Sequence, residues 1–142
     1  MFDLELEGKV AIITGGSDGL GLASARRMAM ERAKVVICAR RENHLERASQ
    51  TLTAETGGTI RGIRADVSNP EDCLNLIEKT KEIFGGVDIL VNNAGTSAAS
   101  PFENVSDEDW KVDLELKVMG AVRMCRGVLP IMREGGGGVI VN

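Results

Sequence analysis

The residues best suited to chemistry lie between Thr14 and Gly21, in the sequence Thr-Gly-Gly-Ser-Asp-Gly-Leu-Gly. They follow an apolar, β-branched run, Val10 to Ile13, that predicts a buried strand, and they open an amphipathic stretch that predicts a helix over 20–32. Such a junction binds anions, because the first N–H groups of a helix have no intrahelical partner and the helix dipole favours negative charge. Glycines also let a pyrophosphate approach the backbone. The junction therefore predicts a phosphate site.

The glycine spacing is Gly15-x-x-x-Gly19-x-Gly21, which differs from the G-x-G-x-x-G of the common dinucleotide fingerprint. Because many strand-to-helix turns contain glycine, a plain tight turn is the alternative. On the phosphate-binding interpretation, the residues expected to contact the ligand are Gly15, Ser17, Asp18, Gly19, Leu20 and Gly21.

The end of the second predicted strand bears on the choice of nucleotide. An acidic residue there would bond to an adenosine ribose and favour NAD, but this place holds Ala39, followed by Arg40 and Arg41. A missing carboxylate and a nearby guanidinium favour a 2′-phosphate, and hence NADP over NAD. Arg40 is the predicted phosphate ligand and Arg41 is left open; the alternative for both is a solvated charge. Asp18 opposes this choice, because it adds a negative charge near the same phosphate.

Two further strand ends carry candidate ligand contacts. The carboxylate of Asp66 can accept a hydrogen bond from an adenine amino group while Val67 packs on the ring, although a turn aspartate before a helix is an equal alternative. The sequence Asn-Asn-Ala-Gly at 92–95 suits the close approach of a flat ligand and cross-bracing of neighbouring strands, but by itself it predicts only a turn. The contacts expected from this segment are Asn93, Ala94 and Gly95.

Composition excludes several classes of function. A net charge of −4 argues against a nucleic-acid surface or an anionic-membrane surface. No apolar run approaches a membrane span, and the start lacks the basic and apolar segments of a signal peptide, so a cytoplasmic protein is expected. The cysteines, Cys38, Cys73 and Cys125, are widely spaced and predict reduced thiols. A metal site is not expected, because His44 is the only histidine and stands in a charged stretch.

Strand-like and helix-like patterns alternate along the whole chain, which predicts one α/β domain over 1–142 with a doubly wound, Rossmann-like parallel sheet. Ligands of such sheets bind at the carboxyl ends of the strands, where the candidate residues fall. The expected strands are 10–14, 34–39, 59–65, 87–91 and 139–141. The expected helices are 20–32, 42–56, 70–84 and a long one from the Ser106 cap to Arg133 with a bend at Pro130.

Together these motifs resemble the short-chain dehydrogenase/reductase family. Thr14 to Gly21 matches the family's TGxxxGxG turn, Asp66-Val67 its adenine pair and 92–95 its NNAG, and 138–142 looks like the strand before its catalytic serine. The resemblance covers the whole chain. It implies a Rossmann-like fold and hydride transfer between NADP(H) and a small carbonyl or alcohol substrate.

The chain departs from this family at the catalytic residues. The family uses a Ser and a Y-x-x-x-K pair whose phenol is the general acid or base, but this chain contains no tyrosine and stops before the serine would appear. No catalytic residue is therefore assigned, and the chain is expected to be the cofactor-binding part of a reductase, incomplete at its C-terminal end and inactive alone. A non-catalytic NADP-binding or regulatory module and an interaction protein that kept only the fold are the alternatives.

The long last helix raises two further questions. Seven residues after Trp110, where the family places a relay asparagine, this chain has Lys117. It could be a substitute relay residue with a pKa lowered by burial, or a lysine whose stem packs while its ammonium reaches solvent. Trp110, Leu114, Leu116 and Val118 are interpreted as core or subunit interface rather than cofactor contacts, and we expect self-association through this helix and the last strand.

Overall fold

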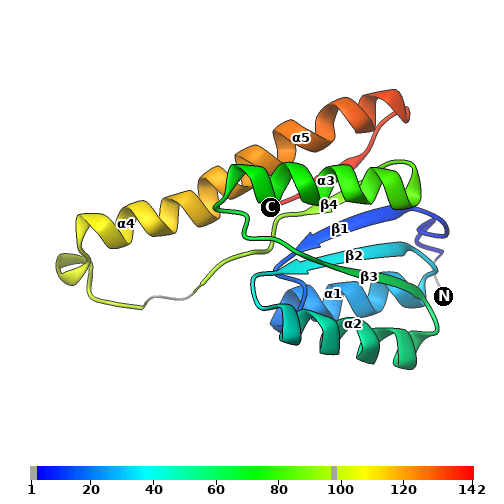
Figure 1. The fold of residues 1–142 in the computed structure, drawn as a ribbon, viewed down its shortest axis with the longest axis horizontal. Coiled ribbons are helices and arrows are strands. Elements are labelled where there is room, and N and C mark those ends of the chain that lie inside the picture. The colour runs from blue at the N-terminus through cyan, green and yellow to red at the C-terminus, as the bar shows by residue number, and fades with distance from the viewer. Residues whose placement is uncertain (1–2, 97–98) are drawn as a thin grey trace.

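The computed structural model describes residues 3–96 and 99–142. Within these residues, one parallel sheet runs in the order β3-β2-β1-β4-β5 (Figure 1). Its strands are β1 (Val10–Thr14), β2 (Lys34–Ala39), β3 (Thr59–Arg64), β4 (Ile89–Val91) and β5 (Val139–Val141). The helices are α1 (Gly19–Met30), α2 (Glu42–Thr56), α3 (Pro70–Phe84), α4 (Asp107–Leu114) and α5 (Gly120–Glu134), with a short 3₁₀ turn, η1 (Phe102–Asn104), and a π-helical turn, η2 (Glu115–Met119).

The chain order reverses at β1, which pairs with β2 on one side and with β4 on the other. Helices α1 and α2 cover one face of the sheet, and α3 and α5 cover the other (Figure 1). The predicted α/β class and doubly wound parallel sheet are therefore confirmed. Because β1 lies at the switch point, its carboxyl end opens into the crevice where ligands of such sheets bind.

The core explains why the strand runs are so apolar. In β2, Val36 and Cys38 join the cluster under α3 and α5, whereas Val35 and Ile37 join the cluster under α1 and α2. Alternate residues of a strand point to opposite faces, so a strand covered on both sides must be apolar at each position. All four side chains are at most 1% exposed.

Helix ends follow the local signals in the sequence. Asn69 caps α3 by accepting from the N–H groups of Glu71 and Asp72, and Pro70 follows in the first helical position. Helices α2 and α3 end at Gly57 and Gly85, both left-handed, as predicted from the glycine pairs.

The long last helix begins after the Ser106 cap and reaches Glu134, as predicted, but it is not α-helical throughout. The π-helical turn η2 interrupts it, and α5 resumes at Gly120 and contains Pro130. Ser106 caps α4 through the Asp109 N–H, as expected, but the Asp109 carboxylate accepts from the Ser106 hydroxyl. Strand β4 is also shorter than expected, since it begins at Ile89.

Helix α4 projects beyond the sheet (Figure 1), so its side chains are not covered by the core. The cysteines Cys38 and Cys73 are buried and Cys125 is half-buried; all three are free thiols. Among the described residues, no helix is both long and apolar enough to cross a membrane.

Replacing Gly21 with alanine should destabilise the fold. A Cβ at this position would lie 2.3 Å from the Gly15 carbonyl oxygen and 2.5 Å from Asn93 Nδ2. Since backbone cannot yield as a flexible side chain does, we expect a loss of about 1–3 kcal/mol in the free energy of unfolding, measured by urea denaturation. Gly86→Ala is the matched control, because a Cβ there would have no neighbour within 4 Å. Equal stability of the two variants would contradict the close packing.

Candidate functional site

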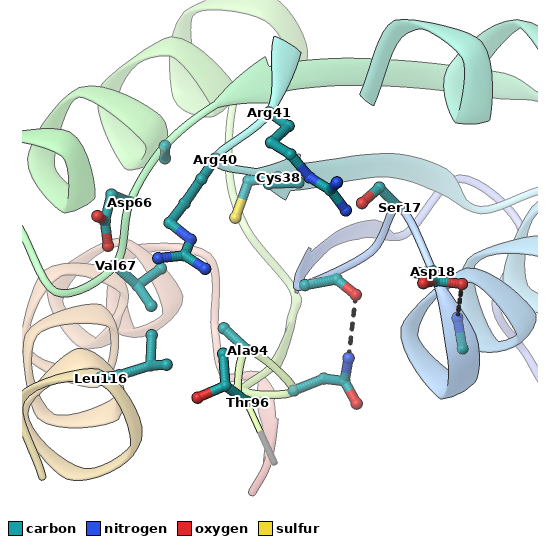
Figure 2. Close-up of a pocket in the computed structure, with 16 residues that line it drawn as sticks. Ser17, Asp18, Cys38, Arg40, Arg41, Asp66, Val67, Ala94, Thr96 and Leu116 are labelled. Carbon is teal, nitrogen blue, oxygen red and sulfur yellow. Dashed lines mark hydrogen bonds between the residues drawn. The ribbon is translucent and has the colours of Figure 1, made fainter. Parts of the chain in front are cut away.

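A cleft of about 410 Å³ opens at the carboxyl ends of β1, β2, β3 and β4. The structure brings most of the predicted contacts together there. Those that line it are Gly15, Ser17, Asp18, Gly19, Arg40, Asp66, Val67, Asn93, Ala94 and Gly95; they are joined by Cys38, Ala39, Arg41, Ala65, Thr96 and Leu116 (Figure 2).

Two predicted contacts lie outside this cleft. Leu20 is 80% exposed on the first turn of α1. Gly21 is buried, and its missing side chain lets the start of α1 pack on the Gly15 carbonyl. A direct role for either residue in ligand binding therefore remains a prediction.

The glycine turn presents an accessible backbone to the cleft. Gly19 has a φ of 52°, a conformation that glycine adopts without strain, and a Cβ there would have nothing within 4 Å. The N–H of Gly19 donates to its neighbour Asp18 over 2.8 Å, so the Asp18 carboxylate caps α1. An anion at this helix end would meet that carboxylate, which gives a structural basis to the opposing charge predicted for Asp18.

Thr14 holds the two sides of the switch point together. Its Oγ1 accepts from the N–H groups of Asn93 and Ala94, each over 3.0 Å, and the Thr14 side chain is only 2% exposed. The Asn93 side-chain amide donates in turn to the Gly15 carbonyl over 3.1 Å. The predicted cross-bracing by the amide segment is thus present, and it links the glycine turn to the loop after β4.

Both arginines after β2 reach the cleft. In Figure 2 the Arg41 side chain extends toward Ser17, whereas the Arg40 side chain turns toward Asp66 and Val67. Neither arginine forms an ion pair with the residues that the structure describes. Both guanidinium groups are consequently available to an anionic ligand, and Arg41, which the sequence left open, lies on the side of the glycine turn.

Asp66 and Val67 form the wall across from the glycine turn. Asp66 Oδ1 accepts from the N–H of Ser68 over 3.0 Å and from its hydroxyl over 2.6 Å. Val67 is 5% exposed and lies against the start of α5, where a Cβ on Gly120 would be 3.1 Å from a Val67 methyl group. This wall offers one polar acceptor beside one apolar surface.

Cys38 lines the cleft but is unsuited to nucleophilic chemistry. Burial raises the pKa of its thiol to about 12, an effect only partly offset by a hydrogen bond with the Gly15 backbone and reinforced by nearby Cys73. The thiolate is the reactive form of cysteine, so at neutral pH Cys38 acts as an apolar wall of the cleft.

Lys117 is not buried, as the relay interpretation would require. Its ammonium pairs with Asp113 over 3.0 Å, and 44% of its side chain is exposed. The stem passes close to Gly95, since a Cβ there would lie 3.6 Å from Lys117 Cε. This arrangement is that of a packed stem with a solvated ammonium.

Leu116, the neighbour of Lys117, packs on the core, as predicted. It also lines the cleft, which no pattern in the sequence indicated. It lies in the π-helical turn η2, for which the sequence carries no clear signal. Cys38 and Ala65 could have been found, because each stands next to a predicted strand-end residue.

These features agree with the comparison against protein families. The chain matches the short chain dehydrogenase family over residues 9–142. It therefore belongs to the short-chain dehydrogenase family, and its sheet is the Rossmann-like sheet of that family.

Solved structures give the same result. Residues covering 98% of the chain superpose with a TM-score of 0.93 on L-sorbose reductase from Gluconobacter frateurii, which is 43% identical and was solved with NADPH and L-sorbose. An NAD⁺-bound xylitol dehydrogenase is 30% identical, with a TM-score of 0.91 over 97% of the chain. Family members of this fold thus bind either dinucleotide.

Among curated relatives, the uncharacterized oxidoreductase YvrD of Bacillus subtilis is 39% identical over 140 residues, or 99% of this chain. The dehydrogenase/reductase SDR family member 4 of Oryctolagus cuniculus is also 39% identical, over 96% of this chain. The match covers 52% of each relative, so this chain spans about half their length.

Thr14→Val should loosen the switch point, because two backbone N–H groups lose their acceptor while the shape of the side chain is kept. We expect a loss of about 1–3 kcal/mol in the free energy of unfolding, measured by urea denaturation. Thr80→Val is the matched control: Thr80 is also fully buried, but its hydroxyl only donates to the Leu76 carbonyl inside α3. A Thr14 variant no less stable than the Thr80 variant would refute the cross-brace.

Proposed function

We propose that this chain is the dinucleotide-binding part of an NADP(H)-dependent short-chain reductase that interconverts a carbonyl and an alcohol. The observation that carries the proposal is the cleft itself, which runs from the glycine turn to Asp66 and Val67. At the end of β2 it has Ala39 where an acidic residue would favour NAD, followed by Arg40 and Arg41. The relative solved with NADPH supports the same choice of cofactor.

The residues of the cleft suit the parts of such a dinucleotide. The open backbone at Gly19 can receive the pyrophosphate, and Arg40 and Arg41 can pair with a 2′-phosphate. Val67 offers a surface for the adenine ring, and its neighbour Asp66 offers an acceptor. When bound, the reduced nicotinamide would supply a hydride; the chain's own part is to bind and orient the dinucleotide.

Among the residues that the structure describes, we assign no donor for the proton of such a reaction. The chain contains no tyrosine, Cys38 is held as a neutral thiol by burial, and Lys117 is paired with Asp113. We therefore infer that the catalytic groups belong to further sequence of a longer polypeptide, in keeping with relatives about twice as long. The 142-residue chain alone should bind NADPH without reducing carbonyl compounds.

A non-catalytic NADP-binding module is the second candidate, and the absence of tyrosine favours it. The two differ in the intact mass of the protein isolated from its native cell. A mass well above 15.2 kDa supports the reductase, whereas a mass of 15.2 kDa supports the binding module.

Removing the two arginines should reduce the preference for NADPH over NADH. Arg40→Ala with Arg41→Ala should lower the affinity for NADPH about tenfold and leave that for NADH nearly unchanged, because only NADPH carries the 2′-phosphate. Calorimetric titration of both ligands measures this. Arg47→Ala, an exposed arginine of α2, is the control for lost positive charge. A wild-type chain that binds neither dinucleotide would refute the proposed function.

We also propose that α4, η2 and α5 pair with a second copy of the chain. Side chains spaced four residues apart leave apolar surface uncovered, with exposures of 42% at Trp110, 49% at Leu114, 50% at Val118 and 38% at Val122. The first turn of α4 is acidic and the last turn of α5 contains Arg133. Two copies in antiparallel contact would bury the apolar stripe and bring unlike charges together.

A lysine on this stripe should weaken self-association. Val118→Lys is expected to lower the association constant at least about tenfold, because pairing would bury an ammonium without a partner. Val112→Lys is the control, since Val112 is 60% exposed but lies off the stripe. Sedimentation equilibrium measures both. A wild-type chain that stays monomeric at high concentration would contradict the pairing.

A further inference from the structure

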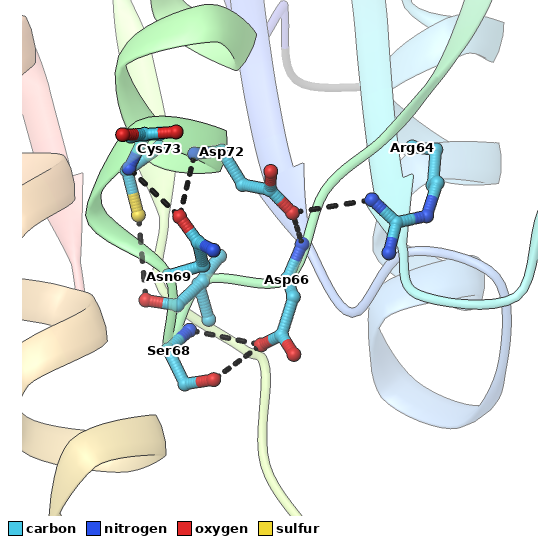
Figure 3. Close-up of polar contacts among 8 residues, drawn as sticks. Arg64, Asp66, Ser68, Asn69, Asp72 and Cys73 are labelled. Atoms are coloured by element: carbon cyan, nitrogen blue, oxygen red, sulfur yellow. Dashed lines mark hydrogen bonds and ion pairs between the residues drawn. The ribbon is translucent and has the colours of Figure 1, made fainter.

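One carboxylate beside the cleft makes contacts that ligand binding alone does not explain. Asp72 lies in the first turn of α3 and does not line the cleft. Its Oδ2 accepts from the backbone N–H of Asp66 over 2.8 Å and from the Arg64 guanidinium over 3.3 Å (Figure 3). Asp72 thus bonds directly to the residue that offers its carboxylate to the cleft.

The Asp66 carboxylate is restrained from a second direction. Its Oδ1 accepts both hydrogen bonds from Ser68, and the Ser68 carbonyl accepts from Arg123 over 3.1 Å. Among the described residues, Oδ2 of Asp66 has no partner, so it is the one carboxylate oxygen left for a ligand. Two contacts restrain the direction of this oxygen: Asp72 accepts from the Asp66 backbone N–H, and Ser68 donates to the Asp66 side chain.

Ordinary helix capping does not account for Asp72. An acidic residue in this position of a capping box accepts from the N–H of the cap residue. Here the cap residue Asn69 donates its N–H to the Asp66 carbonyl over 2.9 Å, and its side chain already accepts from the helix. The Asp72 side chain instead accepts from the N–H of Asp66, three residues before the cap, and so joins α3 to the loop after β3.

We propose that Asp72 is a positioning residue that orients the Asp66 carboxylate for recognition of a 6-aminopurine, and so selects adenine over 6-oxopurines. This inference rests on the proposed dinucleotide-binding function. The 6-amino group of adenine can donate to Asp66 Oδ2, whereas the 6-oxo group of hypoxanthine or guanine would face it with a second acceptor. A carboxylate free to turn away would lose this discrimination.

The test compares two ligands that differ only in this group: NADPH and its deamino form, reduced nicotinamide hypoxanthine dinucleotide phosphate. We expect wild-type protein to prefer NADPH about tenfold, as one charge-assisted hydrogen bond allows. Asp72→Ala should reduce the preference to about threefold or less, through weaker NADPH binding alone. General destabilisation would weaken both ligands and leave the ratio unchanged, so the ratio separates positioning from structure.

Three further variants complete the test. Glu71→Ala removes a charge from the same helical turn and should keep the wild-type affinity ratio, because the Glu71 side chain does not bond to Asp66. Asp72→Asn retains an acceptor oxygen and should therefore also keep the wild-type ratio. Asp72→Leu approximates the aspartate shape without an acceptor, and it serves if Asp72→Ala does not fold by circular dichroism.

The outcomes distinguish this inference from the proposed function. An unchanged ratio in folded Asp72→Ala or Asp72→Leu overturns the role of Asp72 and leaves NADP binding intact. Equal wild-type affinity for the two ligands overturns adenine selection by Asp66. A wild-type chain that binds neither ligand overturns the proposed function, and this inference with it.

Discussion

The bond between the carboxyl ends of β1 and β4 is the constraint on which the site depends. The buried Thr14 hydroxyl accepts the N–H groups of Asn93 and Ala94, and the Asn93 side chain returns a bond to the Gly15 carbonyl. Gly21 packs on that carbonyl with no room for a Cβ. Buried backbone groups need partners, so the glycine turn, the start of α1 and the loop after β4 are fixed as one unit.

Charge is distributed unevenly around this unit. Each acidic group of the cleft has one oxygen engaged, Asp18 with the Gly19 N–H and Asp66 with Ser68. Arg40 and Arg41, in contrast, have no acidic partner among the described residues. The two guanidinium groups are therefore free to meet an anionic ligand, whereas the Asp18 carboxylate is held at the start of α1 by its bond with the Gly19 N–H.

The π-helical turn between α4 and α5 affects two surfaces at once. In an α-helix, residues four apart drift by about 40° around the axis, and one wider turn offsets that drift. The turn lies between Leu114 and Val122, which are both exposed, and it contains Leu116, which lines the cleft. The proposed partner surface and the proposed cofactor site therefore meet at this one local distortion.

The sequence by itself determined the α/β class, the strand ends as the place of the site, and most residues that line the cleft. These followed from local signals: apolar strand runs, glycine and asparagine at helix ends, and polar residues where strands stop. Tertiary structure alone decided the rest. The wide turn at Glu115–Met119, the orientation of Arg41 and the bond from Asp72 to Asp66 depend on how separate elements meet. Residue type and spacing do not predict these tertiary contacts, because the contacts form only when the core packs and each buried polar group is hydrogen-bonded.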